Sequence, residues 1–274
     1  MSVAFVLGGG GRWGAVEVGM LGALTDAEIT PGLIVGTSIG AINGAMFAGE
    51  PTRAGIDQLE RAWRTLADSA ALVPRRRDQL RNLVRLAPSL ITHDAFEDWL
   101  EDQLPARRFE DLRIPFECVA ASIERAAETW FRSGPLMPPL LASSSIPGLF
   151  PPVEVNGEHF YDGGLVNSVP ISRAIELGAT TLYVLQVGRV EQRLSVPKRW
   201  YEAGLVAFEI SRRHRFATLH DQLPEGVTVH LLPSGNTLEP DDKRQLNWSD
   251  FSDTDALMAN ARAATTTYLD DLVP

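Results

Sequence analysis

The stretch that decides the fold runs from Leu33 to Ile42 and reads LIVGTSIGAI. An apolar strand turns there directly into a helix of small residues, and the turn places Ser38 between Gly36 and Gly40. A serine on such a tight turn takes a strained backbone conformation that pushes its hydroxyl out at the end of the strand. The residues two before and two after Ser38 approach each other so closely on this turn that a Cβ on either would clash, which explains the two glycines. Since a helix N-terminus favours developing negative charge, the pattern favours a nucleophile over a simple N-cap serine.

A second glycine-rich turn, GGGGRWG at Gly8–Gly14, lies one helix upstream, between an apolar strand and a helix. Read as G-x-G-x-x-G, it matches a dinucleotide-binding fingerprint, but the next strand should then end in an acidic residue, and it ends in Gly-Thr-Ser. In a second interpretation, backbone N–H groups form an oxyanion hole facing Ser38, because adjacent parallel strands bring both turns to one edge of the sheet. The donors would be Gly9, Gly10 and Gly11.

A serine that transfers acyl groups needs a general base. The chain has five histidines, none in a recognisable catalytic setting: His93, His159, His214, His220 and His230. The better candidate is Asp162, which precedes Gly163 and Gly164, although Asp-Gly alone is also a common turn dipeptide. A free aspartate has a pKa of about 3.9, so Asp162 would serve as a base at neutral pH only if burial raises that value.

Three motifs in one order resemble the patatin-like phospholipase family of serine acyl hydrolases: the glycine loop, the turn at Ser38 and the Asp-Gly-Gly turn at Asp162. Two further blocks are similar to family patterns, ASSSIPGLFPP at Ala142–Pro152 and NSVP at Asn167–Pro170. The resemblance covers residues 3–190. It implies a three-layer α/β/α fold, a Ser38–Asp162 dyad without histidine, an oxyanion hole on the glycine loop, and no cofactor or metal ion. The glycines that would support these motifs are Gly14, Gly36, Gly40, Gly163 and Gly164.

One position departs from the family pattern. The family commonly has Arg or Lys immediately before the last glycine of the loop, where this chain has Trp13, and Arg12 stands one place earlier. The backbone donors of the loop are unaffected by this change, whereas Arg12 should point elsewhere. The departure therefore weakens the expectation that a cation of this loop holds a substrate phosphate, and it weakens the expected preference for phospholipids in the same way.

Length and composition are those of a compact enzyme. With 274 residues, 45% of them hydrophobic, the chain suits a single α/β domain over residues 1–274, or such a domain with a cap. The net charge of −10 argues against a general nucleic-acid binder. The single cysteine, Cys118, excludes a disulfide within the chain and is typical of a cytoplasmic protein. Because the first strand begins at residue 3 and no apolar run reaches transmembrane length, we expect neither a signal peptide nor a membrane span.

Apolar runs and segments of helical periodicity alternate along the chain. Strands are predicted at 3–7, 32–36, 115–122, 128–132, 181–187 and 226–232. Helices are predicted at 15–28, 39–49, 52–67, 93–104, 170–178, 200–222 and 252–270. This alternation indicates a mostly parallel sheet covered on both faces, with residues 191–274 completing the domain.

A basic segment at residues 75–92 falls outside this pattern. Arg77, Arg81 and Arg85 share one helical face, and apolar residues share another. A basic amphipathic helix of this kind is typical of a lid that meets a transient anionic membrane surface. An ordinary surface helix whose arginines pair with neighbouring acids accounts for the pattern equally well.

The expected function is serine-dependent hydrolysis of a carboxylic ester of a lipid, of phospholipase A or lysophospholipase type, in the cytoplasm or peripherally at a membrane. A soluble esterase or thioesterase with the same dyad is the close alternative, and a non-catalytic nucleotide-binding module is a third. A Ser–His–Asp hydrolase would draw its histidine from those after Asp162, but the early position of Ser38, on the second strand, argues against that fold. The sequence leaves acyl-chain length, head group and oligomeric state open.

Overall fold

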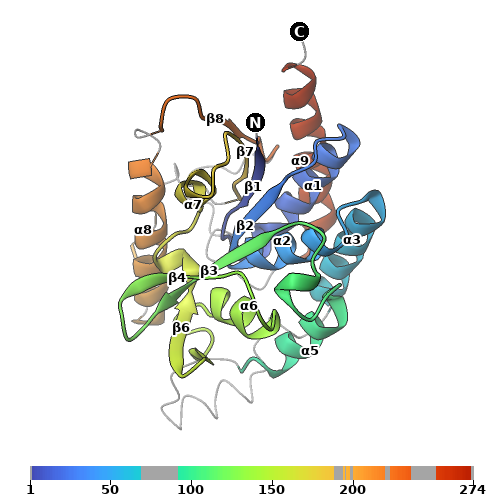
Figure 1. The fold of residues 1–274 in the computed structure, drawn as a ribbon. Helices are drawn as coiled ribbons and strands as arrows, with labels where there is room; N and C mark the ends of the chain where they lie inside the picture. Colours follow the sequence, from blue (N-terminus) through green and yellow to red (C-terminus); the bar gives the residue numbers. More distant parts are fainter. Residues whose placement is uncertain are drawn as a thin grey trace.

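The computed structural model describes residues 2–68, 92–187, 194, 196–197, 200–219, 223–235 and 251–272. Within these residues the sheet has eight strands in the order β5-β6-β3-β2-β1-β7-β8, with β4 also paired to β3 (Figure 1). The strands are β1 Val3–Leu7, β2 Leu33–Thr37, β3 Phe116–Ser122, β4 Ala127–Phe131, β5 Val153–Val155, β6 Glu158–Asp162, β7 Thr181–Leu185 and β8 Thr228–Leu231.

The sheet is mixed, and its antiparallel strands gather at one side. Strands β3, β2, β1, β7 and β8 are parallel neighbours. Strands β4 and β6 both run antiparallel to β3, and β5 runs antiparallel to β6. The predicted parallel arrangement therefore describes five strands, and the prediction did not include the hairpin formed by β5 and β6.

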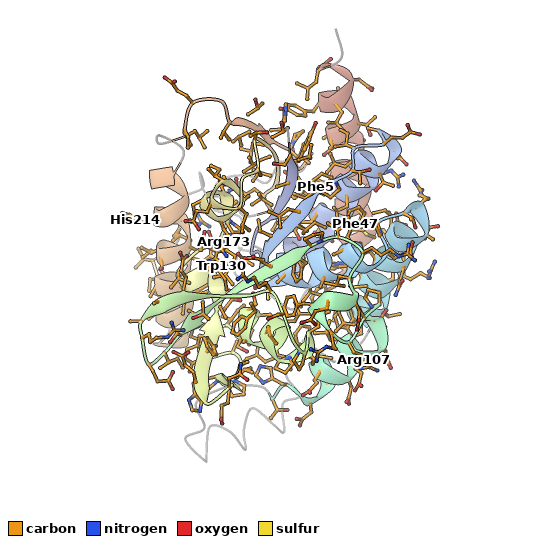
Figure 2. All side chains as sticks on the ribbon, in the orientation of Figure 1. Phe5, Phe47, Arg107, Trp130, Arg173 and His214 are labelled. Atoms are coloured by element: carbon orange, nitrogen blue, oxygen red, sulfur yellow. The ribbon has the colours of Figure 1, made fainter. Side chains whose placement is uncertain are left out.

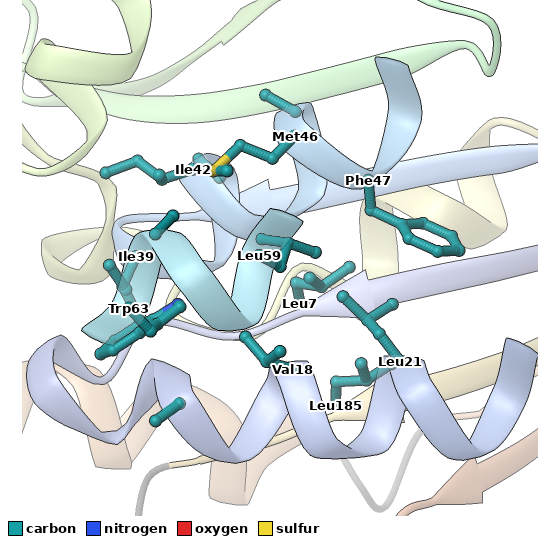
Figure 3. Packing of buried hydrophobic residues seen from close by; sticks show 14 of the residues in the cluster. Leu7, Val18, Leu21, Ile39, Ile42, Met46, Phe47, Leu59, Trp63 and Leu185 are labelled. Carbon is teal, nitrogen blue, oxygen red and sulfur yellow. The ribbon is translucent and has the colours of Figure 1, made fainter. Parts of the chain in front are cut away.

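Helices cover both faces of the sheet. They are α1 Gly14–Asp26, α2 Ile39–Gly49, α3 Arg53–Asp68, α5 Asp94–Gln103, α6 Met137–Ser143, α7 Ile171–Glu176, α8 Trp200–Leu219 and α9 Thr254–Asp270, with 3-10 turns η1 Gly11–Trp13, η2 Phe109–Asp111 and η3 Gly163–Leu165. Phe5 and Leu7 of β1 pack into one core with α1, α2, α3 and α9. Figure 3 shows Leu7 together with residues of α1, α2 and α3. Ala4 and Val6 pack on the other face, against Ile171 of α7. Because β1 is buried on both sides, its sequence is an unbroken apolar run.

Close contacts tie the ends of the chain to this core. Phe5 of β1 stacks on Phe47 of α2 with ring centroids 6.0 Å apart, and Figure 2 labels both side chains. A Cβ on Gly19 of α1 would lie 2.1 Å from the carbonyl oxygen of Met258 in α9. The two helices therefore pack backbone against backbone. Strands β7 and β8 belong to the same sheet, and α9 belongs to the same core.

Two elements near the site were not predicted, and each has a local signal. Strands β5 and β6 are joined by Asn156 and Gly157, which have φ of 54° and 82°. Asn-Gly with two positive φ angles is the preferred two-residue hairpin turn. Helix α6 carries proline in its first turn. The missing N–H groups cost nothing there, so these prolines are compatible with a helix.

The other predicted strands and helices agree with the structure to within three residues at each end. Residues 75–91 of the predicted lid lie outside the described residues, as does His220. In the part of the chain that the structure describes, no helix is long and apolar enough to cross a membrane.

Candidate active site

Ser38 stands on a strained turn between β2 and α2. Its φ of 56° and ψ of −125° lie in a region that residues other than glycine rarely adopt. A Cβ on Gly36 would lie 2.6 Å from the carbonyl oxygen of Gly40, and a Cβ on Gly40 would lie 2.6 Å from that of Leu7. Both glycines are therefore required by backbone contact, one within the turn and one against β1.

The aspartate predicted as the base lies against this serine. The hydroxyl of Ser38 donates a hydrogen bond of 2.6 Å to Oδ2 of Asp162, and the amide of Gly164 donates one of 2.7 Å to Oδ1. Asp162 ends β6, opposite Ala120 of β3, which is the strand beside β2. The sheet thus brings together two residues separated by 124 positions.

The environment of Asp162 changes its acidity. Its side chain is fully buried, and the loss of hydration raises its pKa to about 7, against the lowering influence of the bonds from Ser38 and Gly164. The nearby charge of Arg212 also lowers this pKa, and that of Glu209 raises it. A carboxylate with such a pKa is matched to proton transfer at neutral pH.

The glycine loop leaves β1 beside the turn at Ser38, because Leu7 is paired with Gly36 in the two parallel strands. A Cβ on Gly9 would lie 3.2 Å from Cβ of Ser38, so the loop backbone rests against the serine. Gly10 likewise has no room for a side chain, since its Cβ would lie 2.1 Å from Cγ2 of Val187. The loop therefore lies where the sequence predicted it.

The amide donors of the loop are not equivalent. The N–H of Gly8 donates to the carbonyl of Leu185 at 3.0 Å, and the N–H of Gly9 donates to the carbonyl of Ser168 at 2.9 Å. Gly9 was predicted as an oxyanion donor, but in this conformation its N–H group is already used within the fold. The predicted donors that this leaves are Gly10 and Gly11.

The serine-rich block at residues 142–152 holds the backbone of both members of the pair. Oγ of Ser143 accepts a hydrogen bond of 2.9 Å from the amide of Ser38. The carbonyl of Ser145 accepts one of 2.9 Å from the amide of Asp162. In the sequence, this block was identified only because it resembles the family pattern. The two contacts show what it does in the fold: it holds the backbone at Ser38 and at Asp162.

The block at residues 167–170 contacts both the serine turn and the glycine loop. The hydroxyl of Thr37, next to Ser38, donates to the carbonyl of Asn167 at 2.8 Å. The neighbouring carbonyl of Ser168 accepts the Gly9 amide. Adjacent carbonyls thus fix the serine turn and the glycine loop relative to each other.

Three of the five histidines, His93, His159 and His230, contact side chains other than Ser38. Nε2 of His93 lies 2.8 Å from Oγ of Ser145, and because that hydroxyl donates to the carbonyl of Leu141, the histidine is the donor. His159 pairs with Glu124 at the surface, and His230 contacts Tyr268, while His214 is exposed on α8 (Figure 2). The hydroxyl of Ser38 bonds to Asp162 directly, so the geometry does not support the alternative with a Ser–His–Asp arrangement.

Arg12 points away from the site, as expected from its position in the loop. Its side chain is buried and forms an ion pair of 3.0 Å with Asp253, the residue before α9. The guanidinium also lies 4.4 Å from the ring centroid of Trp13. Arg12 therefore fastens the loop to α9 and is not exposed to a substrate phosphate. Among the described residues, no cluster of three His, Cys, Asp or Glu side chains forms a metal-binding group.

The fold and the site together define an α/β protein in which a strained serine is paired directly with a buried aspartate. The model of the patatin-like phospholipase family matches residues 5–175, and the chain belongs to that family. Among curated proteins, it is 32% identical over 193 residues to patatin-like phospholipase domain-containing protein ZK370.4 of Caenorhabditis elegans. The match covers 70% of this chain and 14% of that protein.

Two further relatives carry more specific names. Neuropathy target esterase sws of Drosophila melanogaster is 31% identical over 68% of this chain, and lysophospholipase NTE1 of Mycosarcoma maydis is 29% identical over 70% of it. The matches span only 13% and 10% of the length of those proteins. Among solved structures, the chain is similar to VipD from Legionella pneumophila, with 14% identity, a TM-score of 0.46, and coverage of 98% of this chain and 67% of that one.

Proposed function

We propose that this protein hydrolyses carboxylic esters of lipids, in the manner of a phospholipase A or lysophospholipase, with Ser38 as nucleophile and Asp162 as general base. The observation that carries the proposal is the 2.6 Å hydrogen bond from the strained, glycine-flanked serine to a fully buried carboxylate. Activation of a weak nucleophile by an adjacent base is the arrangement that covalent catalysis requires.

The proposed reaction proceeds in two balanced steps. Asp162 takes the hydroxyl proton of Ser38 while Oγ attacks the ester carbonyl carbon, and the same proton then passes to the alcohol oxygen as the ester bond breaks. Acyl-Ser38 remains, and the alcohol leaves. Water then gives a proton to Asp162 and attacks the acyl carbon, and return of that proton to Oγ of Ser38 releases the acid. The net change is one ester and one water converted to one acid and one alcohol.

The negative charge that develops on the carbonyl oxygen needs fixed donors. The amides of Gly10 and Gly11 are proposed for this role, and the Gly9 backbone sets the loop against Ser38, since its own amide is bonded to Ser168. Loss of one such donor typically costs about 100- to 1,000-fold in rate, so the loop is as important as the dyad.

Lipid esters are proposed as substrates because the relatives include a lysophospholipase and patatin-like phospholipase domain proteins. A soluble ester or thioester hydrolysed by the same dyad is the second candidate. Trp13 and the buried Arg12 favour it, because neither places a cation of the glycine loop where a lipid phosphate would bind. No cofactor enters the proposed mechanism.

Activity on a chain-length series of p-nitrophenyl esters and on phospholipid and lysophospholipid vesicles tests the proposal. We expect hydrolysis that is lost in Ser38→Ala, with longer acyl chains and lipid substrates preferred. Hydrolysis of short soluble esters alone would move the assignment to the second candidate. Equal rates in the wild type and in Ser38→Ala would contradict the mechanism.

A further inference from the structure

A buried arginine from α8, the orange helix of Figure 1, holds the glycine loop. The side chain of Arg212 is buried, and its Nη1 donates a hydrogen bond of 2.9 Å to the carbonyl oxygen of Gly9. Two further donors bind Glu209, three residues earlier on the helix, with Nη2 at 2.9 Å from Oε2 and Nε at 3.2 Å from Oε1. Glu209 is buried as well, so the guanidinium is fixed in one plane and one orientation.

The bond to Gly9 determines where the next amide points. Peptide bonds in the described chain are trans, so the carbonyl of Gly9 and the N–H of Gly10 point in opposite directions from one plane. With the carbonyl held on Arg212, the Gly10 N–H is directed away from α8. Ser168 restrains the preceding peptide, because its carbonyl accepts the Gly9 amide, and its hydroxyl donates to the carbonyl of Arg212 at 2.9 Å.

Such restraint has a purpose in a loop of consecutive glycines. Glycine gives the backbone more freedom than any other residue, whereas an oxyanion donor is effective only when its orientation is fixed before the reaction. We propose that Arg212, held by Glu209, is a positioning residue that sets the Gly9–Gly10 peptide so that the Gly10 amide is presented to the oxyanion formed at Ser38. The inference rests on the proposed function and adds the α8 ion pair to its machinery.

The pairing with Glu209 accounts for how a cation is tolerated beside the base. Burial is the main influence on the pKa of Asp162, but Arg212 lowers that pKa and Glu209 raises it. A lone guanidinium would weaken Asp162 as a base. The ion pair supplies the hydrogen bond to Gly9 with little net charge next to Asp162.

The double variant Glu209→Gln/Arg212→Met tests the hydrogen bond, because it removes the Arg212 cation together with the buried carboxylate that pairs with it. We expect kcat for a soluble short-chain p-nitrophenyl ester to fall on the order of 100-fold, as for one lost oxyanion donor, with KM changed less than about threefold. The affinity for an alkyl trifluoromethyl ketone, which forms an oxyanion adduct with the serine, should fall by a similar factor. Binding of an unreactive ether analogue of the substrate should stay unchanged.

Two single variants serve as comparisons. Arg212→Lys keeps a cationic donor for the Gly9 carbonyl and should be at least about tenfold faster than the double variant. Arg213→Met removes the neighbouring guanidinium, which contacts the same Glu209 at 3.2 Å, and should change kcat by less than about twofold. Thermal unfolding of each variant checks that it is folded. If the double variant does not fold, Arg212→Met, which leaves Glu209 paired with Arg213, replaces it in the same comparison.

The outcomes separate the role of Arg212 from the proposed function. Wild-type kcat and ketone affinity in the double variant would overturn the positioning role while leaving the dyad intact. An equal loss in Arg213→Met would also overturn it, because packing of α8 would then explain the effect. Absence of ester hydrolysis in the wild type, or its survival in Ser38→Ala, would instead refute the proposed function and the role of Arg212 with it.

Discussion

The acidity of Asp162 makes a prediction about the pH dependence of catalysis. Because only the ionised carboxylate accepts the Ser38 proton, kcat/KM should follow the ionised fraction of Asp162, whose pKa burial raises to about 7. The rate should level off above about pH 8 and fall about tenfold per unit below pH 6, with about one tenth of the plateau left at pH 6. An aspartate of ordinary pKa would give a flat profile down to about pH 5.

The assay measures kcat/KM for a soluble p-nitrophenyl ester between pH 5 and pH 9. The released p-nitrophenol is followed at the isosbestic wavelength of its neutral and ionised forms. Asp162→Asn retains the shape of the side chain but cannot take the proton, so its rate should be at least about 100-fold lower. The remaining activity of Asp162→Asn should not show the fall in rate around pH 7. A flat wild-type profile through pH 6, or the same limb in Asp162→Asn, would refute the assignment of Asp162 as the titrating base.

Three further outcomes are expected. Because the folded-state pKa of Asp162 lies above its unfolded value, its protonation stabilises the fold, and that stability is lost as pH rises through about 7. In urea titrations, the wild type should lose about 2–3 kcal/mol of unfolding free energy from pH 5 to pH 8 relative to Asp162→Asn. The same pH dependence of the unfolding free energy in both proteins would contradict the buried carboxylate. Ser143→Ala removes the acceptor of the Ser38 amide and should lower kcat about tenfold. Ser144→Ala removes a hydroxyl that donates to the carbonyl of Leu140 in α6, and it should change kcat less than about twofold; equal effects would deny Ser143 a special role. Glutamine at all three arginines of the predicted lid should weaken binding to anionic vesicles and slow their hydrolysis while sparing a soluble short-chain ester, and an equal loss on both substrates would mean that the segment does not act as a lid. These lid residues are Arg77, Arg81 and Arg85.

The parts of the site that the sequence predicted are those with a local signal. Ser38 and its two glycines form a complete pattern within ten residues, and the structure shows the backbone contacts that require them. Asp162 was recognised through the order of the motifs, because its Asp-Gly turn is ambiguous alone. Its pairing with Ser38 arises because β6 lies antiparallel to β3, and nothing in the local sequence encodes that neighbour.

The parts that the sequence did not predict depend on contacts between distant segments. The amide of Gly9 is hydrogen-bonded because the Ser168 carbonyl lies beside it. The sequence of the glycine loop alone does not predict this contact. Arg212 lies 203 residues from the carbonyl that it holds, on a helix whose sequence gives no sign of a site. The hairpin of β5 and β6 differs from these, since its Asn156-Gly157 turn is a local signal that was available.

Reaction with a fluorophosphonate probe tests the central claim most directly, because the probe bonds covalently only to an activated serine. Intact-mass and peptide mass spectrometry should show one adduct per chain, on Ser38. Labelling should vanish in Ser38→Ala and be slow in Asp162→Asn. An adduct on another serine, or labelling that persists in Ser38→Ala, would contradict the account.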